Sequence, residues 1–174
     1  DANEERKKGN YVVEEPGKGF RRVVSAPNPV KIVELDAINA LLNADQLVVA
    51  CGGGGIPVTL QGNHLKGASA VIDKDFASCL MAKDLDADFL IILTAVEKVA
   101  VNYGKPDEKW IDHMTVEEAK QYMEEGHFAP GSMLPKVQAA VKFAESKPGR
   151  TALITLLEKA KDGINGVTGT RISL

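Results

Sequence analysis

The chain has 174 residues, of which 44% are hydrophobic and 26% charged, and its formal net charge at pH 7 is −3. These values are typical of one ordinary globular domain, or of one lobe of a larger protein. The slight acidity does not favour a nucleic-acid or membrane partner, and the 5% content of aromatic residues argues against a base-stacking surface.

The two cysteines, Cys51 and Cys79, stand far apart in a spacing that fits neither a metal site nor a redox motif. The three histidines share no ligand spacing, so no metal site is predicted. The sequence shows no secretory leader and no apolar run long enough to span a bilayer. We therefore expect a cytoplasmic protein with reduced cysteines.

The beginning of the chain is mostly polar, and residues 1–16 are predicted to form a loop or the remnant of a subdomain junction. Residues 17–24 are predicted to form a turn that enters a strand. Pro27 and Pro29 then force extended backbone. Apolar residues spaced three and four apart predict a helix from about Ile32 to Leu42.

A run of four glycines, Gly52–Gly55, follows the β-branched segment Leu47–Val49, which we predict to be a short buried strand. Residues without side chains lose much backbone entropy on folding, so such a run is typical of backbone with positive φ or with a very close neighbour. At the carboxyl end of a strand, that neighbour is commonly a ligand. The alternative is a tight turn packed on its own domain. No Gly-Lys-Ser/Thr follows, which excludes a Walker A loop.

Beyond the glycine run, predicted strands alternate with predicted helices. The strands are a peripheral hairpin over residues 58–67, Phe89–Leu93 (covered on both faces), Val99–Tyr103, Thr151–Leu156 and a last strand near Gly169–Ile172. The helices begin after Asp73, at a Thr115/Glu118 capping box, after Gly131 and near Leu157, with a surface loop over residues 104–114. This alternation predicts an α/β fold with a largely parallel sheet.

Three junctions carry residues suited to phosphoryl transfer: the glycine run, Asp73-Lys74-Asp75 and residues 131–136. In an open parallel sheet such junctions share the carboxyl edge, where ligands bind. Lys74 and Lys136 at that edge, with Asp75 between them, could neutralise and position a transferred phosphoryl group. Each lysine taken alone is better explained as a solvated charge, so the hypothesis depends on their joint position.

Five segments resemble the carboxyl-terminal half of carbamate kinases in order and spacing. They are CGGGGIPV from Cys51, AVIDKDFAS from Ala70, IILTAVEKV from Ile91, NYGKP from Asn102 and GHFAPGSMLPK from Gly126. The closing Gly169-Thr170 also fits. The resemblance implies the amino acid kinase fold, a three-layer sandwich with a mainly parallel central sheet. Residues 17–174 would form its carboxyl-terminal, nucleotide-binding lobe.

The resemblance also implies a reaction, reversible phosphoryl transfer between ATP and carbamate that gives ADP and carbamoyl phosphate, with Mg²⁺ carried by the nucleotide. A homodimer and the ATP-forming direction in arginine catabolism are implied as well. Lys74 and Lys136 would contact the phosphates and the migrating group, and Asp75 would orient the lysines. The residues implied in nucleotide binding are Gly52, Gly53, Gly54, Gly55, Asp73, Tyr103, Met133 and Lys136.

The chain departs from the family pattern at several positions. Ala95 stands where an acid is usual, and Leu134 stands where a small residue lets a phosphate approach. The amino-terminal half, which in the family holds carbamoyl phosphate, has no counterpart here, so the isolated chain is expected to be an inactive fragment. Two alternatives stay open: a related kinase with another small acceptor, and a non-catalytic nucleotide-binding module.

Overall fold

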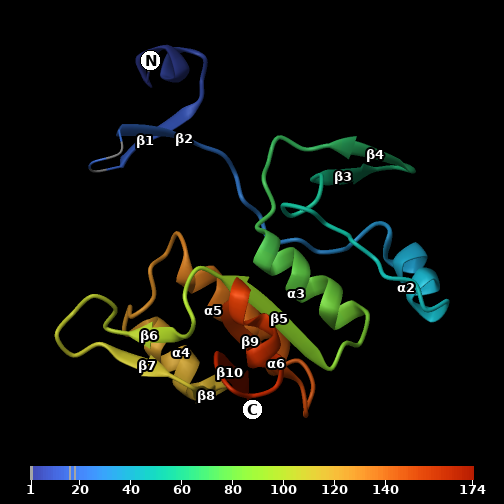
Figure 1. Cartoon of the computed structure of the whole chain (residues 1–174). Coiled ribbons are helices and arrows are strands. Elements are labelled where there is room, and N and C mark those ends of the chain that lie inside the picture. The colour runs from blue at the N-terminus through green and yellow to red at the C-terminus, as the bar shows by residue number, and fades with distance from the viewer. Residues whose placement is uncertain (1, 16, 18) are drawn as a thin grey trace.

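The computed structural model describes residues 2–15, 17 and 19–174 and has a four-stranded sheet at its centre (Figure 1). The strands lie in the order β5 (Phe89–Thr94), β9 (Thr151–Leu156), β10 (Thr170–Ser173) and β8 (His113–Thr115). β5 runs parallel to β9, and β10 runs parallel to β8 but antiparallel to β9. The predicted α/β fold with a mainly parallel sheet is confirmed.

Helices cover both faces of β9, which makes this part of the molecule three-layered. α5 (Met133–Ala144) is the most buried helix and packs on α3 (Lys74–Asp84), on α4 (Val116–Glu124) and on the sheet. Its buried face joins Ala152 and Ile154 of β9 in one core. On the opposite face, Gly163 of α6 (Ala160–Ile164) lies against Leu153 and Thr155. The short 3₁₀ helix η1 (Leu157–Lys159) connects β9 to α6.

Smaller units surround this sheet. α1 (Ala2–Lys7) and the hairpin of β1 (Tyr11–Glu15) with β2 (Gly19–Val23) lie apart from it (Figure 1). The chain then passes through α2 (Leu35–Asn43) and the hairpin of β3 (Val58–Gln61) with β4 (His64–Gly67). A further two-stranded sheet pairs β6 (Val99–Val101) with β7 (Lys109–Ile111).

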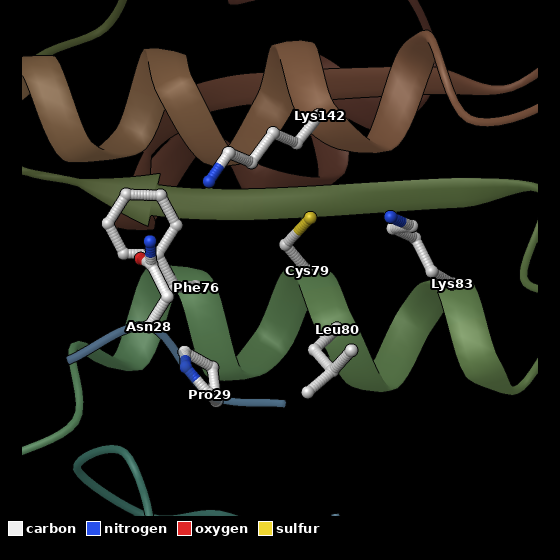
Figure 2. Close-up of a pocket in the computed structure, with 7 residues that line it drawn as sticks. All are labelled: Asn28, Pro29, Phe76, Cys79, Leu80, Lys83 and Lys142. Atoms are coloured by element: carbon white, nitrogen blue, oxygen red, sulfur yellow. The ribbon is translucent and has the colours of Figure 1, made fainter. Parts of the chain in front are cut away.

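Between β2 and α2, the proline-containing segment crosses α3 (Figure 2). Ser25 accepts a backbone hydrogen bond from Val71 at 2.9 Å. Asn28 and Pro29 border a hollow of about 140 Å³ whose other walls are side chains of α3 and α5. On one of these walls, the Lys142 Nζ atom lies 4.7 Å from the centre of the Phe76 ring. The crossing therefore ties the first part of the chain to α3.

Several local predictions are confirmed. The hairpin of residues 58–67 forms with a two-residue turn between Gln61 and His64. At the start of α4, the Glu118 amide donates to the Thr115 hydroxyl at 3.1 Å and the Thr115 amide donates to the Glu118 carboxylate at 2.8 Å. The strand Thr151–Leu156 has the bounds that were predicted.

Other predictions are wrong. Residues 2–7 form a helix and residues 11–15 a strand, which contradicts the loop that was one of two alternatives for residues 1–16; the other, a remnant of a subdomain junction, stays a prediction. β7 with the start of β8 lies in the predicted loop 104–114. Leu47–Val49 is not a buried strand: no described strand pairs with it, and the Leu47 and Val49 side chains are fully exposed. β5 is fully covered on one face only: Leu90 and Ile92 are buried, while on the other face Phe89 and Ile91 are half-buried and Leu93 is 40% exposed.

The glycine run is attached to the start of α3 through Gly54. Gly54 is buried with φ +131°, and a Cβ atom placed on it would lie 2.0 Å from the carbonyl oxygen of Ile72. Ile72 directly precedes Asp73, the N-cap residue of α3. The tight-turn explanation therefore holds at Gly54. Around Gly52, Gly53 and Gly55 a Cβ atom would meet nothing within 4 Å.

We expect Gly54→Ala to lower the free energy of unfolding by about 1–3 kcal/mol, because the new methyl group overlaps a backbone oxygen and the residue must keep positive φ. Chemical denaturation followed by circular dichroism measures the change. Gly53→Ala is the matched control, since its Cβ atom enters open space without positive φ. An equal loss of stability in both variants would contradict a special role for Gly54.

Candidate functional site

A buried ion pair joins the starts of α3 and α5. The Lys136 Nζ atom lies 2.9 Å from Asp75 Oδ2 and 3.3 Å from Asp75 Oδ1. The two side chains are only 12% and 8% exposed. A lysine near the positive end of a helix is electrostatically unfavourable by itself, and an unpaired buried charge is costly. The carboxylate of Asp75 therefore stabilises the charged ammonium of Lys136 in this position.

The topology places this pair at a sheet edge where ligands commonly bind. α3 leads into β5 and α5 leads into β9, each through a short turn, and the two strands are parallel. A helix that packs on the sheet and returns into the next strand begins at the carboxyl edge of that sheet. The structure thus confirms that the junctions at Asp73 and at residues 131–136 meet.

Asp73 and Lys74, which precede Asp75 at the start of α3, have surroundings that differ from those of the ion pair. The Asp73 carboxylate accepts a hydrogen bond from the Asp75 amide at 2.7 Å and so caps the helix. Lys74 is exposed and forms no ion pair with any residue that the structure describes. Its ammonium is therefore free to meet an anion from solution, whereas that of Lys136 is already held.

The start of α5 has few free amides. The Ser132 and Leu134 amides both donate to the carbonyl of Ala129 at 3.1 Å. Pro135 has no N–H to offer. An ordinary helix N-terminus presents several free N–H groups to an anion. Because this one presents fewer, an anion at α5 depends mainly on the ammonium of Lys136. The acceptor role of Ala129 had no signal in the sequence.

The side chain of Leu134, which was expected to stand where a phosphate approaches, packs partly buried against the core instead. Met133 also packs against the core. Tyr103 is 65% exposed and meets Trp110 edge to face, with ring centres 6.0 Å apart. The structure therefore places Tyr103 and Met133 in different surroundings, and their role at a nucleotide stays a prediction.

All four glycines of the run line an open groove of about 1140 Å³, together with residues 27–34, part of α2 and the start of β3. Within the described part of the chain, none of the other predicted site residues lines this groove. These residues are Asp73, Lys74, Asp75, Tyr103, Met133 and Lys136. The glycine run is thus connected to the Lys136–Asp75 pair through Ile72 and Asp73, but the two do not share one cavity.

The structure gives little support for a reactive cysteine, a metal site or a membrane-spanning helix. Burial raises the pKa of the thiols of Cys51 and Cys79, which disfavours a reactive thiolate. In the ranges that the structure describes, no group of three or more His, Cys, Asp and Glu residues is placed to hold a metal ion. None of the described helices has the length and apolar character needed to cross a membrane.

Sequence comparison connects the chain to one family. Residues 10–155 match the profile described as Amino acid kinase family. The chain is 59% identical over 166 residues to the carbamate kinase-like protein YqeA of Escherichia coli (strain K12), covering 95% of this chain and 54% of that protein. It is 51% identical over 168 residues to the carbamate kinase of Clostridium perfringens, covering 97% of this chain and 54% of that protein. The chain spans about half the length of these relatives.

Solved structures of related proteins also superpose closely on the chain. The carbamate kinase from Giardia lamblia bound to AMP-PNP superposes with a TM-score of 0.88 at 42% identity, over 97% of this chain and 53% of that chain. A crystal structure of project APE1968 from Aeropyrum pernix K1 superposes with a TM-score of 0.88 at 46% identity, over 99% of this chain and 55% of that chain. With most of the sequence inside the family profile and nearly all of the fold superposed, the chain belongs to the amino acid kinase family.

Proposed function

We propose that the protein transfers a phosphoryl group between ATP and carbamate, giving ADP and carbamoyl phosphate. The observation that carries the proposal is the buried Lys136–Asp75 pair at the carboxyl edge of the sheet. The similarity to carbamate kinases, one of them bound to AMP-PNP, supports both the acceptor and the nucleotide.

Lys136 would neutralise the migrating group. Phosphoryl transfer spreads negative charge over the equatorial oxygens, so the protein acts mainly by positioning and by charge. An ammonium has three N–H donors, and its contacts with the two oxygens of Asp75 leave one for a phosphoryl oxygen. Because both oxygens of Asp75 face Lys136, that carboxylate would orient the lysine and take no part in attack. Burial strengthens the charge interaction relative to water.

The remaining residues would hold the phosphates and the nucleotide. Lys74 would bring a second positive charge, since its ammonium is exposed and unpaired within the described residues. The open space around Gly52, Gly53 and Gly55 would let phosphate oxygens approach the backbone. Asp73, Tyr103 and Met133 would complete the proposed nucleotide site, and Leu134 beside them packs partly buried against the core.

Mg²⁺ would enter with the nucleotide and supply further neutralisation of phosphate charge. Protein-bound Mg²⁺ commonly keeps several waters and is held by substrate phosphates with one or two carboxylates. The carboxylates at the start of α3 already have partners, Asp75 in Lys136 and Asp73 in a backbone amide. These residues fit a metal held mainly by the phosphates.

We further propose a homodimer, a cytoplasmic location and the ATP-forming direction in arginine catabolism, on the strength of the family resemblance. A nucleotide-binding module without transfer is the second candidate. It is favoured by one observation: the glycine run and the Lys136–Asp75 pair line no common cavity in the described part of the chain. A related kinase with another small acceptor would form no ATP from carbamoyl phosphate but would do so from a different phosphorylated acceptor.

Replacing Lys136 by methionine should reduce ATP formation from ADP and carbamoyl phosphate by at least about 100-fold, because one preorganised charge at the transferred group is lost. The assay uses the chain alone and the chain combined with the part of the C. perfringens carbamate kinase that it does not match, because the chain spans about half that protein. Lys161→Met, at an exposed position of α6, is the matched control. Undiminished turnover by folded Lys136→Met protein would contradict the role of Lys136.

Nucleotide binding is tested separately by calorimetry with Mg-ATP. We expect Tyr103→Ala to raise the Kd for ATP about tenfold, the size of one lost aromatic–base stack. Tyr11→Ala on β1 is the control, since Tyr11 is also exposed but lies in the unit apart from the sheet. An unchanged Kd in Tyr103→Ala would place the nucleotide elsewhere. ATP binding without any phosphoryl transfer would favour the non-catalytic module.

A further inference from the structure

The first residue of β10, Thr170, is fully buried and uses its hydroxyl in two hydrogen bonds. The Val99 amide donates to Thr170 Oγ1 at 2.8 Å, and the Thr170 hydroxyl donates to the carbonyl of Ile111 at 2.5 Å. Val99 and Ile111 lie opposite each other at the open end of the hairpin that β6 forms with β7. One hydroxyl therefore holds both strands of this hairpin.

The hairpin of β6 and β7 depends on side chains for its placement. In the described part of the chain, neither strand pairs with the four-stranded sheet. Val99 and Ile111 are buried in the core, but apolar burial has no preferred direction, whereas a hydrogen bond does. A second hydroxyl acts at the same place, since Thr155 of β9 donates to the carbonyl of Glu97 at 3.2 Å. These hydroxyls therefore fix how the hairpin is oriented on the sheet.

The loop of this hairpin carries Tyr103 and is held on both sides of that residue. The side-chain amide of Asn102 donates to the Asp107 carboxylate at 2.6 Å. The backbone amide of Gly104 donates to the Glu108 carboxylate at 2.7 Å. These two bonds limit the movement of the Tyr103 backbone relative to the strands. An anchor on the strands is thus passed on to Tyr103.

The ring of Tyr103 is restricted by Trp110 of β7. Successive side chains of a strand point to opposite faces, so Trp110 faces away from the side on which Ile111 is buried. The rings of Trp110 and Tyr103 meet edge to face, with an angle of 85° and centres 6.0 Å apart. This geometry is attractive between aromatic rings. Tyr103 remains 65% exposed, so its oriented ring stays accessible to a ligand.

We propose that Thr170 and Trp110 are positioning residues for the nucleotide, and that both act through Tyr103. Thr170 fixes the hairpin on the sheet, and Trp110 fixes the ring that the hairpin carries. A ring that is ordered before binding loses less conformational freedom when a base stacks on it, which strengthens binding. The inference rests on the proposed function, because it takes Tyr103 as a nucleotide contact.

The first test uses the fluorescence of Trp110, the single tryptophan of the sequence. Thr170→Val keeps the size of the side chain but leaves the Val99 amide and the Ile111 carbonyl without their partner. We expect acrylamide quenching of Trp110 to rise about twofold, because a hairpin without its anchor opens more often to solvent. Thr170→Ser retains the hydroxyl and should behave as the wild type.

The second test measures the Kd for Mg-ATP by calorimetry. Thr170→Val and Trp110→Leu should each raise this Kd about fivefold, because Tyr103 must then be ordered during binding. Either change combined with Tyr103→Ala should stay near the tenfold of Tyr103→Ala alone, whereas independent effects would multiply to about fiftyfold. Trp110→Phe keeps an aromatic ring and should stay near the wild-type value.

Ser146→Ala is the matched control for lost stability. The Ser146 hydroxyl also makes two hydrogen bonds, to the Phe143 carbonyl and from Arg150, but it lies just beyond the other end of α5. We expect this variant to leave both the quenching and the Kd unchanged. An equal rise of the Kd in Ser146→Ala would assign the effect to stability and overturn the inference.

Unchanged quenching in Thr170→Val, or effects on the Kd that multiply with Tyr103→Ala, would also overturn the inference. Circular dichroism verifies the fold of each variant. Should Thr170→Val fail to fold, Trp110→Leu carries the test, because Trp110 is 44% exposed. A Kd raised by Tyr103→Ala but by neither Thr170→Val nor Trp110→Leu would overturn the inference and leave the proposed function standing. A Kd unchanged even in Tyr103→Ala would contradict the proposed nucleotide site as well.

Discussion

The packing of α5 against both α3 and the sheet is the constraint on which the site depends. α5 has six buried residues in its twelve, and its small side chains Ala139, Ala140 and Ala144 are fully buried. Close packing of this kind leaves little freedom in the position of the helix. It brings the start of α5 beside the start of α3, so that Lys136 and Asp75 meet within 2.9 Å although they are far apart in the chain.

The same arrangement explains why Lys136 and Lys74 differ in burial and in ion pairing. Lys136 lies between the helices and is paired, whereas Lys74 lies one residue before Asp75 on the exposed side of α3. A held charge and a free charge have different uses at an anion site: the first is preorganised, and the second can follow a mobile phosphate. The Gly54–Ile72 contact adds a rigid connection from this region to the glycine run.

The structure also has an open groove, lined by the glycine run and mostly by apolar residues. Within the described part of the chain, β5 is the end of the sheet and no strand pairs with residues 46–50. The glycine run and the Lys136–Asp75 pair line no common cavity in the described part of the chain.

How much the sequence could predict depended on how local the cause was. The strand Thr151–Leu156, the Thr115/Glu118 capping box and the hairpin of residues 58–67 follow from residue patterns and turns within a few positions. The carboxyl edge as a meeting point of the two lysine-bearing junctions follows from the strand–helix alternation. Short segments such as β7 were missed because their own residues carry no strong strand pattern. Pairing with β6 makes β7 a strand.

By itself, therefore, the sequence determined the α/β alternation, most element positions and the resemblance that the family match bears out. Only the tertiary structure decided which strands are covered, which lysine is paired and which glycine is required by packing. Leu47–Val49 shows the reason: its composition is that of a buried strand, but burial and pairing depend on neighbours that are distant in the chain. Asp75 and Gly54 likewise owe their roles to single contacts, with Lys136 and Ile72, that no local pattern contains.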